Sequence, residues 1–440
     1  MIFSILIFSI LLFSAGGFFY LQAKKVRRNI LLGRDTTRND MKGERVKTML
    51  RVAFGQSKMG SRPVAAIMHL FIYVAFLITQ IELLEIIIDG ISGGHRRIWH
   101  LAHDTFLAGL YTFTINFIEI ISVLAFIATL VFLSRRNLIK LSRFQKPELK
   151  GWPSKDANLI LLMEIVLIVC VLTMNATDLV LQQRGETFET SKFIISSQLT
   201  GIFSGLDNSS LSILERIGWW GHVLGIFGFL VYLPFSKHFH ILLAFPATYY
   251  SNLNAKGKFN NLDSVTDVVK PNFDPSYQPI TDLNNPQRFG AKDVQDLSWK
   301  QLLDSYTCTE CGRCTSACPQ NITGKELSPR KILMDTRDRL EEVGKNIDAN
   351  GGTFKDDGKS LLGDYIKPEE IWACNTCNAC VQECPINLDP LSIILDLRQF
   401  LVMEQSQAPN ELNGMFTNIE NNGAPWQFSP SDRLNWAKEQ

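Results

Sequence analysis

The chain has 440 residues, of which 46% are apolar, and its 44 Lys and Arg against 43 Asp and Glu leave a formal net charge of +1. A balance this close to neutral excludes a protein that holds nucleic acid through a large excess of positive charge, and we expect no nucleic-acid partner. The apolar residues crowd into the first 250 positions, which excludes an ordinary soluble domain for that half of the chain.

Five apolar runs in this half are each long enough to cross the roughly 30 Å hydrocarbon core of a bilayer, which takes about 20 helical residues. They cover 2–22, 63–89, 104–134, 157–181 and 216–245. Backbone polar groups in lipid must be paired within their own segment, so we expect helices. The sequence therefore predicts a bundle of five transmembrane helices over 1–250, with the N-terminus and the C-terminal half on opposite sides of the membrane.

The distribution of Lys and Arg predicts the orientation of this bundle. The connections 23–62 and 135–156 hold nineteen of them, whereas the loops 90–103 and 182–215 hold four. The positive-inside rule places the basic connections, and with them the C-terminal half, on the cytoplasmic side of a bacterial inner membrane. The first run has no basic stretch before it and basic residues directly after it, which indicates an uncleaved helix with its N-terminus outside rather than a secretory signal.

The histidines are confined to the first 250 residues. They are His69, His95, His100, His103, His222, His238 and His240. An ionisable side chain in a membrane indicates function by default, and imidazole is the usual axial ligand of haem iron. His222 and His240 are five helical turns apart, so both would project from one face of the fifth helix, about 27 Å apart. His238 falls about 160° from His222 and ranks below His240, and His95 is expected to be a solvated loop residue.

Matching depths in the membrane suggest how these histidines pair. His69 begins the second run on the cytoplasmic side, so His69 and His240 are the expected ligands of an inner haem b. His222 begins the fifth run on the outer side, where His103, or alternatively His100, is the expected partner for a second haem b. The competing interpretation is that these are packing histidines and that the helices form a haem-free anchor with a quinone pocket.

Four carboxylates fall inside the apolar runs. Glu82 and Glu85 lie in the second run, Glu119 near the middle of the third, and Glu164 in the fourth. Each is interpreted either as a proton-relay or quinone-site group or as a neutral acid hydrogen-bonded to a neighbouring helix. Cys170, isolated in the fourth run, is interpreted as a small buried apolar side chain.

After the membrane half, residues 251–300 are polar and rich in Pro and Asn, which indicates an extended cytoplasmic linker. An amphipathic helix is predicted from 328 to 342, with Ser328 as its N-cap and Pro329 in its first turn. The Gly-, Asp- and Lys-rich stretch 343–362 is predicted to be an exposed loop. No Gly-rich phosphate-binding fingerprint for a nucleotide or flavin is present in the sequence.

Eight of the nine cysteines form two runs with the same spacing. The first is Cys308-x2-Cys311-x2-Cys314-x3-Cys318-Pro319, and the second is Cys374-x2-Cys377-x2-Cys380-x3-Cys384-Pro385. This is the bacterial ferredoxin run, in which the fourth Cys ligates the other of two [4Fe–4S] clusters. The predicted ligand sets are therefore Cys308, Cys311, Cys314 and Cys384 for one cluster, and Cys374, Cys377, Cys380 and Cys318 for the other.

Two alternative uses of these cysteines are less consistent with the pattern. Structural zinc usually binds separated Cys-x2-Cys pairs rather than four clustered thiolates before a Pro, and disulfides are rare in a reducing compartment. The expected fold is mainly α: a five-helix transmembrane bundle, then a small α-helical dicluster ferredoxin-like domain over 301–405. The tail 406–440 would dock a partner or cover the clusters.

The membrane half, through His222 and the stretch Pro234-Phe-Ser-Lys-His-Phe-His240, resembles the nitrate reductase gamma-subunit type of dihaem, quinone-reactive membrane protein. The second half, from Cys308 to the tail Pro425-Trp426 … Arg433-x2-Trp436, is similar to the iron–sulfur subunits of heterodisulfide reductase-like complexes. The resemblance covers nearly the whole chain, as a fusion of the two. The gamma type has a second ligand about three turns after the His that matches His69. Here Thr79 stands there, so an outer haem would need His103 or His100.

The resemblance implies a membrane-bound oxidoreductase subunit that passes electrons between quinone, haem b and two [4Fe–4S] clusters, to or from a cytoplasmic partner. Heterodisulfide reductase-like catalytic subunits carry CCG cysteine repeats, whereas this chain has no adjacent Cys-Cys pair. The residues that act on the final substrate are therefore expected on a partner protein with CCG-type cysteines or a flavin. Rival interpretations are a subunit of an electron-coupled ion pump, for which Glu119 would be essential, and a redox-sensing membrane protein.

Overall fold

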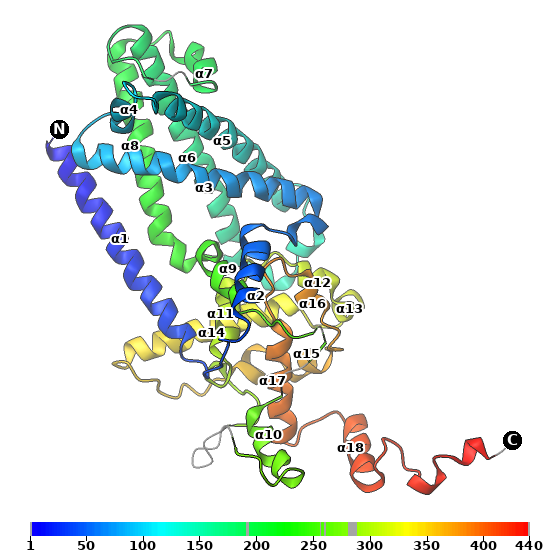
Figure 1. The fold of residues 1–440 in the computed structure, drawn as a ribbon. Helices are drawn as coiled ribbons and strands as arrows, with labels where there is room; N and C mark the ends of the chain where they lie inside the picture. Colours follow the sequence, from blue (N-terminus) through cyan, green and yellow to red (C-terminus); the bar gives the residue numbers. More distant parts are fainter. Residues whose placement is uncertain (1, 191–192, 256, 259–260, 280–287, 439–440) are drawn as a thin grey trace.

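The computed structural model describes residues 2–190, 193–255, 257–258, 261–279 and 288–438. Across these residues the chain is helical, and its only β-structure is two isolated bridges. Long helices form a splayed bundle at one end, and a group of shorter helices packs against the end of that bundle (Figure 1). The predicted fold class, a membrane-type bundle followed by a small helical domain, is confirmed.

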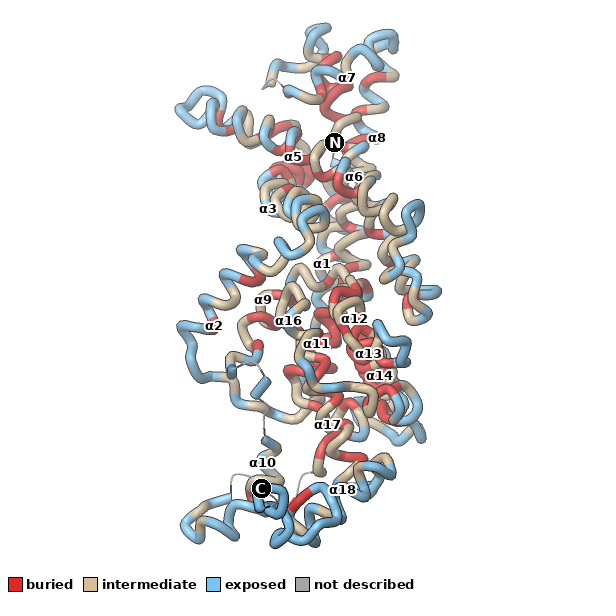
Figure 2. Tube along the Cα trace, turned by 90° about the vertical axis from the view of Figure 1, so that its right-hand side faces the viewer, coloured by how far each residue is buried: buried red, intermediate tan, exposed pale blue. Residues whose placement is uncertain are grey.

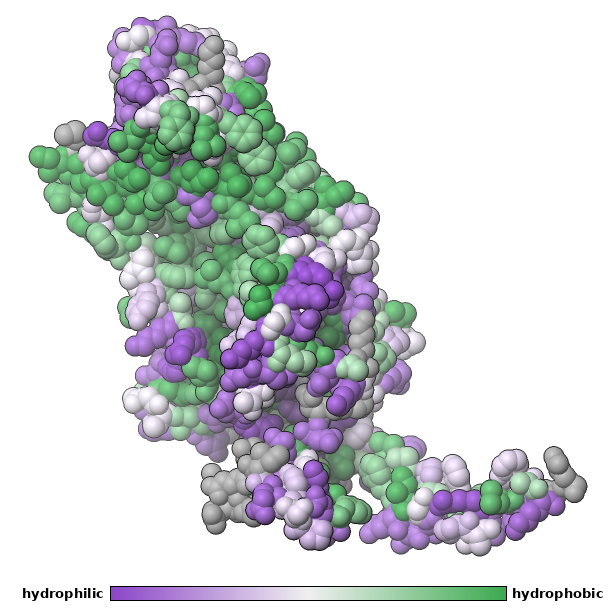
Figure 3. Space-filling model, in the orientation of Figure 1, coloured by the Kyte–Doolittle hydropathy of each residue, from purple (hydrophilic) through white to green (hydrophobic). Residues whose placement is uncertain are grey.

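Five helices of the bundle are long and apolar enough to cross a membrane. They are α1 (Ile2–Ile30), α3 (Pro63–Ser92), α5 (Ala108–Asn137), α6 (Trp152–Gln183) and α8 (Asn208–Tyr232). Large apolar side chains such as Phe13 and Phe113 remain exposed on their outer faces. These faces form the broad hydrophobic belt of Figure 3, which suits contact with lipid.

Helices α6 and α8 pack closely because three glycines of α8 face α6. A Cβ atom at Gly218 would lie 2.8 Å from the Cys170 carbonyl oxygen, and one at Gly221 would lie 2.8 Å from the Cys170 sulfur. At Gly225 the contact would be with Leu167, at 2.6 Å. Small residues let helix backbones approach closely in membranes. Cys170 is accordingly a packing residue in this interface, consistent with its interpretation from the sequence.

The fifth membrane helix differs from the prediction at both ends. It begins at Asn208 rather than 216, and its α-helical part ends at Tyr232. Pro234 lies in the 3-10 turn that follows, and Ser236 is extended. A second turn then leads into a separate helix, α9 (His240–Tyr249). The expectation that His222 and His240 share one continuous helix face is therefore wrong, because proline removes a backbone donor and the chain changes direction there.

Three helices build the core of the second half. They are α11 (Trp299–Thr307), α14 (Pro329–Ala349) and α17 (Pro390–Met403). Leu302, Ile332 and Leu397 lie fully buried among them, and Figure 2 shows burial concentrated in this group. As predicted, the Ser328 hydroxyl caps α14, where it accepts from the Lys331 amide at 3.4 Å.

Helix α14 continues to Ala349, so the loop predicted from 343 is wrong in its first seven residues. Val343 and Ile347 extend the apolar face of the helix and are buried in the core. Gly344 lies against α1, and a Cβ atom there would stand 2.5 Å from the Asn29 side chain. The glycine is therefore a close-packing position between the two halves rather than a loop signal.

The domain and the bundle share one hydrophobic core. Val26 and Ile30 of α1 and Ala247 of α9 belong to the same buried cluster as the α11, α14 and α17 residues. Asn29 also donates to the Tyr306 hydroxyl at 3.0 Å across this boundary. The second half is thus fixed against the membrane helices, rather than tethered to them by a linker.

The remaining helices are short. They are α2 (Lys42–Met49), α4 (Arg97–Ala102), α7 (Ser196–Phe203), α10 (Asp263–Val269), α12 (Arg313–Ala317), α13 (Pro319–Ile322), α15 (Pro368–Trp372), α16 (Ala379–Glu383) and α18 (Asn410–Asn422). The predicted linker contains α10, and its residues 256, 259–260 and 280–287 lie outside the described part. Helix α18 and the tail extend away from the bundle beyond the far end of α17 (Figure 1).

Candidate iron–sulfur and histidine sites

The two cysteine runs fold in the same way. In each run the residue two positions after the first Cys is left-handed, namely Glu310 (φ 57°) and Thr376 (φ 53°). The residue after the second Cys is left-handed as well, namely Gly312 (φ 71°) and Asn378 (φ 63°). Such alternation curls the backbone and turns successive N–H groups toward one centre, which suits an anionic cluster. The repeated cysteine spacing therefore corresponds to a repeated loop conformation.

The fourth cysteine of each run lies beside the other run, because α12 and α16 pack together. Cys384 is close enough to Cys308, Cys311 and Cys314 to interact with them electrostatically. Burial first, and then the neighbouring Cys311 thiol, raises the pKa of Cys384 to about 11. All four of these cysteines line one small cavity.

In the second set, the fourth cysteine of the first run lies beside the second run. Cys318 is an electrostatic neighbour of Cys374 and Cys380, and Cys374 is a neighbour of Cys377. Cys318 and Cys380 are buried, whereas Cys377 is exposed at the surface. The structure thus brings together the cysteines of both crossed sets, and the second set is the one that reaches solvent.

The donor chemistry of these sets fits two [4Fe–4S] clusters. No three His, Cys, Asp or Glu side chains among the described residues gather tightly enough to hold a single metal ion. A [4Fe–4S] cluster binds each of its four thiolates through a different iron, so its ligands stand farther apart than those of one zinc ion. Burial raises the thiol pKa of Cys308 to about 12, so binding of iron there would displace a proton.

The segment before α3 clamps the cysteine loops. The Lys58 ammonium donates to the Val381 carbonyl at 3.0 Å and to Asn387 at 2.8 Å. Arg62 donates to Ser316 at 3.0 Å and lies 3.7 Å from Glu383. Both α12 and α16 are therefore tied to the start of the second membrane helix, which places the first cysteine set directly beneath the bundle.

Three histidines meet at this end of the bundle. His69 of α3 lies close enough to His238 and His240 to interact with them electrostatically, and the His238 and His240 ring centroids are 5.3 Å apart. Arg313 of α12, between Cys311 and Cys314, is also an electrostatic neighbour of His69. The expected pair His69 and His240 is thus brought together, next to the first cysteine set.

In both rings of this pair, Nδ1 contacts an oxygen atom of a neighbouring residue. His240 Nδ1–H donates to the Lys237 carbonyl at 3.1 Å, and His69 Nδ1 lies 3.1 Å from the Gln56 side-chain oxygen. A carbonyl oxygen can only accept, so Nδ1 carries the proton and Nε2 keeps its lone pair. Such contacts orient metal-binding histidines and fix their tautomer.

The expected outer pair is not brought together. His222 lies 14 residues into α8, about 21 Å from its start, so it is deep in the bundle rather than at its outer end. Its Nδ1–H donates to the Leu167 carbonyl of α6 at 3.1 Å. His103 instead lies 3.0 Å from Asp104 and is partly exposed. The His100 ring packs against Phe188 at a tilt of 56°, with centroids 4.3 Å apart.

His95 differs from its prediction as well. Its ring lies 3.7 Å from the buried Asp178 carboxylate, and its side chain is only 25% exposed. It packs against Phe188 with ring centroids 5.5 Å apart. His95 therefore belongs to the packed cap of the bundle rather than to a solvated loop, because Asp178 and Phe188 both pack against it.

Three of the four membrane carboxylates have structural partners. Glu119 accepts from the Ile195 and Ser196 amides, at 2.8 and 3.3 Å, and caps α7. Glu85 accepts from the Tyr111 hydroxyl at 2.7 Å, and Glu164 accepts from Thr129 at 3.1 Å. Glu82 is buried near Glu85 and Glu119. Glu85 also forms an ion pair with Arg96, 3.5 Å away. These contacts fit acids that are held by neighbouring helices and loops.

A charged contact between the two halves of the protein was not predicted from the sequence. Lys237 lies in the turn just before α9, and its ammonium pairs with Glu310 of the first cysteine loop. Lys237 also lies 3.8 Å from Asp156 of α6, and Arg337 of α14 donates to Glu310 at 2.9 Å. The only sequence signal was a lysine inside the Pro234–His240 stretch, because the partner residues are remote in the chain.

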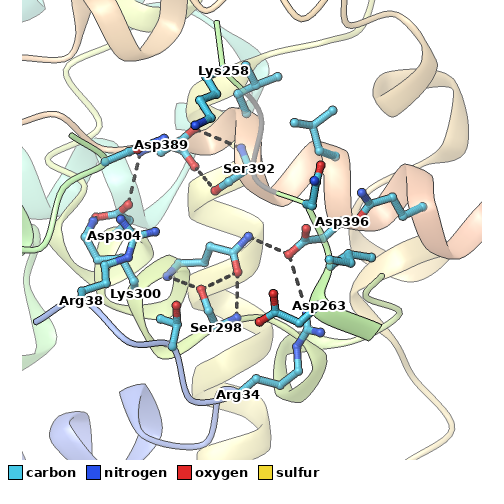
Figure 4. Close-up of a pocket in the computed structure, with 18 of the residues that line it drawn as sticks. Arg34, Arg38, Lys258, Asp263, Ser298, Lys300, Asp304, Asp389, Ser392 and Asp396 are labelled. Carbon is cyan, nitrogen blue, oxygen red and sulfur yellow. Dashed lines mark hydrogen bonds and ion pairs between the residues drawn. The ribbon is translucent and has the colours of Figure 1, made fainter. Parts of the chain in front are cut away.

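A polar cleft of about 200 Å³ opens beside the second cysteine set (Figure 4). Asn378, which follows Cys377, and Asp389, an electrostatic neighbour of Cys380, both line it. The Lys300 ammonium pairs with Asp304, and Arg34 lies 3.7 Å from Asp396. Because opposite charges pair along the wall of the cleft, this wall is polar with little net charge.

Comparison with known proteins identifies the class of the second half. A family described as "4Fe-4S dicluster domain" matches residues 307–388, which contain both cysteine runs. This part of the chain is therefore a dicluster iron–sulfur domain, and it follows five helices of membrane-spanning length. No solved structure has a significant match to the chain.

Two longer relatives align with nearly the whole chain. The chain is 29% identical over 90% of its length to the "Probable iron-sulfur-binding oxidoreductase FadF" of Bacillus subtilis. It is 27% identical over 99% of its length to the "EtfAB:quinone oxidoreductase" of Syntrophomonas wolfei. These alignments cover 55% and 59% of the two relatives, so the chain spans little more than half of their length.

A shorter stretch is similar to a component of another redox complex. Over 27% of the chain, the sequence is 33% identical to a polypeptide of the ferredoxin/F(420)H(2)-dependent CoB-CoM heterodisulfide reductase of Methanosarcina acetivorans. The alignment covers 60% of that polypeptide. The sequence of the second half suggested a similarity to heterodisulfide reductase components. The comparison confirms this similarity.

Proposed function

We propose that this chain is a membrane-bound electron-transfer subunit of an oxidoreductase, which connects membrane quinone with a cytoplasmic redox partner. The observation that carries the proposal is the position of His69, which neighbours both His240 and Arg313, a residue inside the first cysteine run. A redox site in the bundle and a redox site in the domain would then be neighbours. Iron–sulfur clusters and haem each accept and release single electrons, which suits such a relay.

The residues that would hold the cofactors follow from the crossed arrangement. Cys308, Cys311, Cys314 and Cys384 would hold the cluster next to the bundle, and Cys374, Cys377, Cys380 and Cys318 the cluster next to the surface. His69 and His240 would hold one haem b, with Gln56 and the Lys237 carbonyl orienting their rings. A second haem would use His222 with a ligand other than His103.

The partner is proposed to be a flavoprotein or a protein with CCG-type cysteine clusters. One relative is named for an EtfAB:quinone reaction and others for heterodisulfide reduction, and either chemistry would need a two-electron partner outside this chain. Exposure of Cys377 favours docking over the second cysteine set, since electrons leave most easily where a cluster is near the surface. The basic connections 23–62 and 135–156 support a cytoplasmic position for this face.

The experiment is a dithionite-reduced visible spectrum with iron analysis of the purified full-length protein. We expect a b-type haem band together with about eight iron atoms outside haem. A quinol added to membranes should then reduce both the haem and the clusters, as followed by the haem band and the cluster absorption. Zinc in place of iron would overturn the proposal. Clusters without haem would favour the second candidate, a haem-free iron–sulfur anchor with a quinone pocket.

A further inference from the structure

The helix between the first two membrane helices has two chemically different faces. Helix α2 (Lys42–Met49) continues through a π-helical turn, Leu50–Phe54, and we call residues 42–54 together the connecting helix. It lies between the C-terminal end of α1 and the N-terminal end of α3 (Figure 1). Its position is therefore at the edge of the membrane-spanning region, on the side of the dicluster domain.

The inner face of the connecting helix is built into the protein. Arg45 is only 3% exposed, and its guanidinium donates to the Tyr249 and Ser251 carbonyls at 3.2 and 3.1 Å. Tyr249 is the last residue of α9, the helix that begins at His240, and Ser251 follows that helix. Val52 and Ala53 are buried on the same face. The connecting helix is thus held rigidly against α9.

The outer face carries a stripe of large apolar side chains. Val46, Leu50 and Phe54, spaced four residues apart, are 42%, 52% and 54% exposed. This stripe is continuous with the surface of a membrane helix, because the Phe54 ring packs edge-on against Tyr73 of α3, with ring centroids 6.4 Å apart. An exposed apolar stripe that joins a lipid-facing surface is itself suited to contact with the bilayer.

Basic residues flank this stripe. Lys42, Lys47 and Arg51 are exposed, whereas the one exposed acid of the helix, Glu44, lies 3.5 Å from Lys47. Long basic side chains beside an inserted apolar stripe place their charges at the level of the headgroups. Each such charge contributes about fivefold to affinity for an anionic surface.

We propose that the connecting helix is an in-plane membrane anchor that binds anionic phospholipid. Its Val46–Leu50–Phe54 stripe inserts into the leaflet on the domain side, and Lys42, Lys47 and Arg51 bind the headgroups. Through Arg45, the lipid contact also holds the C-terminal end of α9 in place. The proposal does not depend on the cofactors, so it stands or falls separately from the proposed function.

The test uses the full-length protein in nanodiscs of phosphatidylcholine alone or of an equimolar mixture with phosphatidylglycerol. Hydrogen exchange of the 42–54 peptide should be slower in either nanodisc than in detergent, and slowest with phosphatidylglycerol. A titration with phosphatidylglycerol, followed by native mass spectrometry, should show an affinity at least about fivefold lower for the variant K42Q/K47Q/R51Q. The variant L50Q/F54Q should lose the slower exchange even where the charges remain.

The matched control is K270Q/R433Q/K438Q, which removes the same charge from exposed positions in the turn after α10 and in the tail, the region farthest from the bundle in Figure 1. Its affinity for phosphatidylglycerol should equal that of the wild type. An equal loss in the control, or no loss in K42Q/K47Q/R51Q, would overturn the proposal. So would a 42–54 peptide that exchanges rapidly in nanodiscs and slows only when a soluble partner protein is added, since that would make the stripe a protein-docking surface.

Discussion

The Lys237 ammonium and the Glu310 carboxylate form a buried ion pair that joins the membrane half to the first cysteine loop. Their side chains are 9% and 2% exposed. Burial works to raise the pKa of Glu310, but the charges of Lys237 and Arg337 outweigh it and lower the pKa below its usual range. The Lys237 carbonyl also accepts from His240. One residue therefore contacts both the proposed haem ligand and the loop between Cys308 and Cys311.

Removing either charge of this pair should destabilise the protein. K237M leaves Glu310 with Arg337 alone, and E310Q leaves Lys237 with Asp156 alone. We expect each loss of a buried partner to cost up to about 3 kcal/mol in the free energy of unfolding. The double variant should cost less than the sum of the two, with a coupling of about 1–3 kcal/mol. Denaturant titration in detergent, followed by cluster absorbance, measures the free energy of unfolding of the two single variants and the double variant.

The control for this cycle is the exposed pair Lys359–Glu342, 2.6 Å apart, in the same domain. Its coupling should not exceed about 0.5 kcal/mol, because solvent screens exposed charges. Strictly additive costs at Lys237 and Glu310 would show that the pair does not hold the two halves together.

The crossed cysteine sets predict the iron content of double variants. C308S/C384S removes two ligands of one cluster and should retain about four iron atoms per chain. C374S/C384S removes one ligand from each cluster, and we expect it to lose both. If each run instead holds its own cluster, C374S/C384S would keep about four iron atoms and C308S/C384S would keep none. Iron analysis of the two proteins, purified side by side without oxygen, separates these outcomes.

The histidine arrangement predicts which substitutions remove haem. H240A and H69A should each abolish the b-type band, because each removes one axial ligand. H238A and H95A should retain it, although His238 is adjacent in space to His240. Q56L should weaken haem retention by about 10- to 100-fold, because Gln56 orients His69. Retention of haem in H240A would show that His238 or His222 is the ligand instead.

A substitution of Glu119 tests whether this acid has a structural role or a role in ion pumping. Because its carboxylate caps α7 through the Ile195 and Ser196 amides, E119Q should lower stability by about 1 kcal/mol. Quinol-driven reduction of the clusters in proteoliposomes should continue at nearly the wild-type rate, with any ion movement unchanged. Loss of ion movement with normal folding would instead support the pump interpretation.

Truncation after Gln405 tests the docking role of the tail. Phe416, Ile419, Trp426 and Trp436 are all exposed there, so their removal should leave the unfolding free energy within about 0.5 kcal/mol of the full chain. The truncated protein should keep its iron and its reduction by quinol but lose co-purification of the partner. The tail begins beyond the far end of α17, about 21 Å from Pro390, so the partner would have to contact both the tail and the surface near Cys377. A variant W426A/W436A with normal partner recovery would argue against this role.

The sequence alone determined the class of this protein. Cysteine spacing specifies cluster ligands because a cubane needs thiolates at short, defined intervals, and that information is local. Apolar runs of membrane length specify helices because a backbone in lipid has no other way to pair its polar groups. For this reason the five helices, the dicluster domain and the Ser328 cap of α14 could all be predicted.

Only the tertiary structure decided which remote residues meet. The break at Pro234–Ser236 moves His240 off the helix of His222, so a count of helical turns could not give their relation. Lys237, Asp156 and Glu310 come from three distant segments, and their pairing depends on how α6 and the cysteine loop pack. The residue type of Glu119 and its depth in the membrane are the same for a proton relay and for a cap of α7, so the sequence could not distinguish these roles. Its role depends on the fold of the 195–196 turn, because a carboxylate takes its function from the donors that surround it.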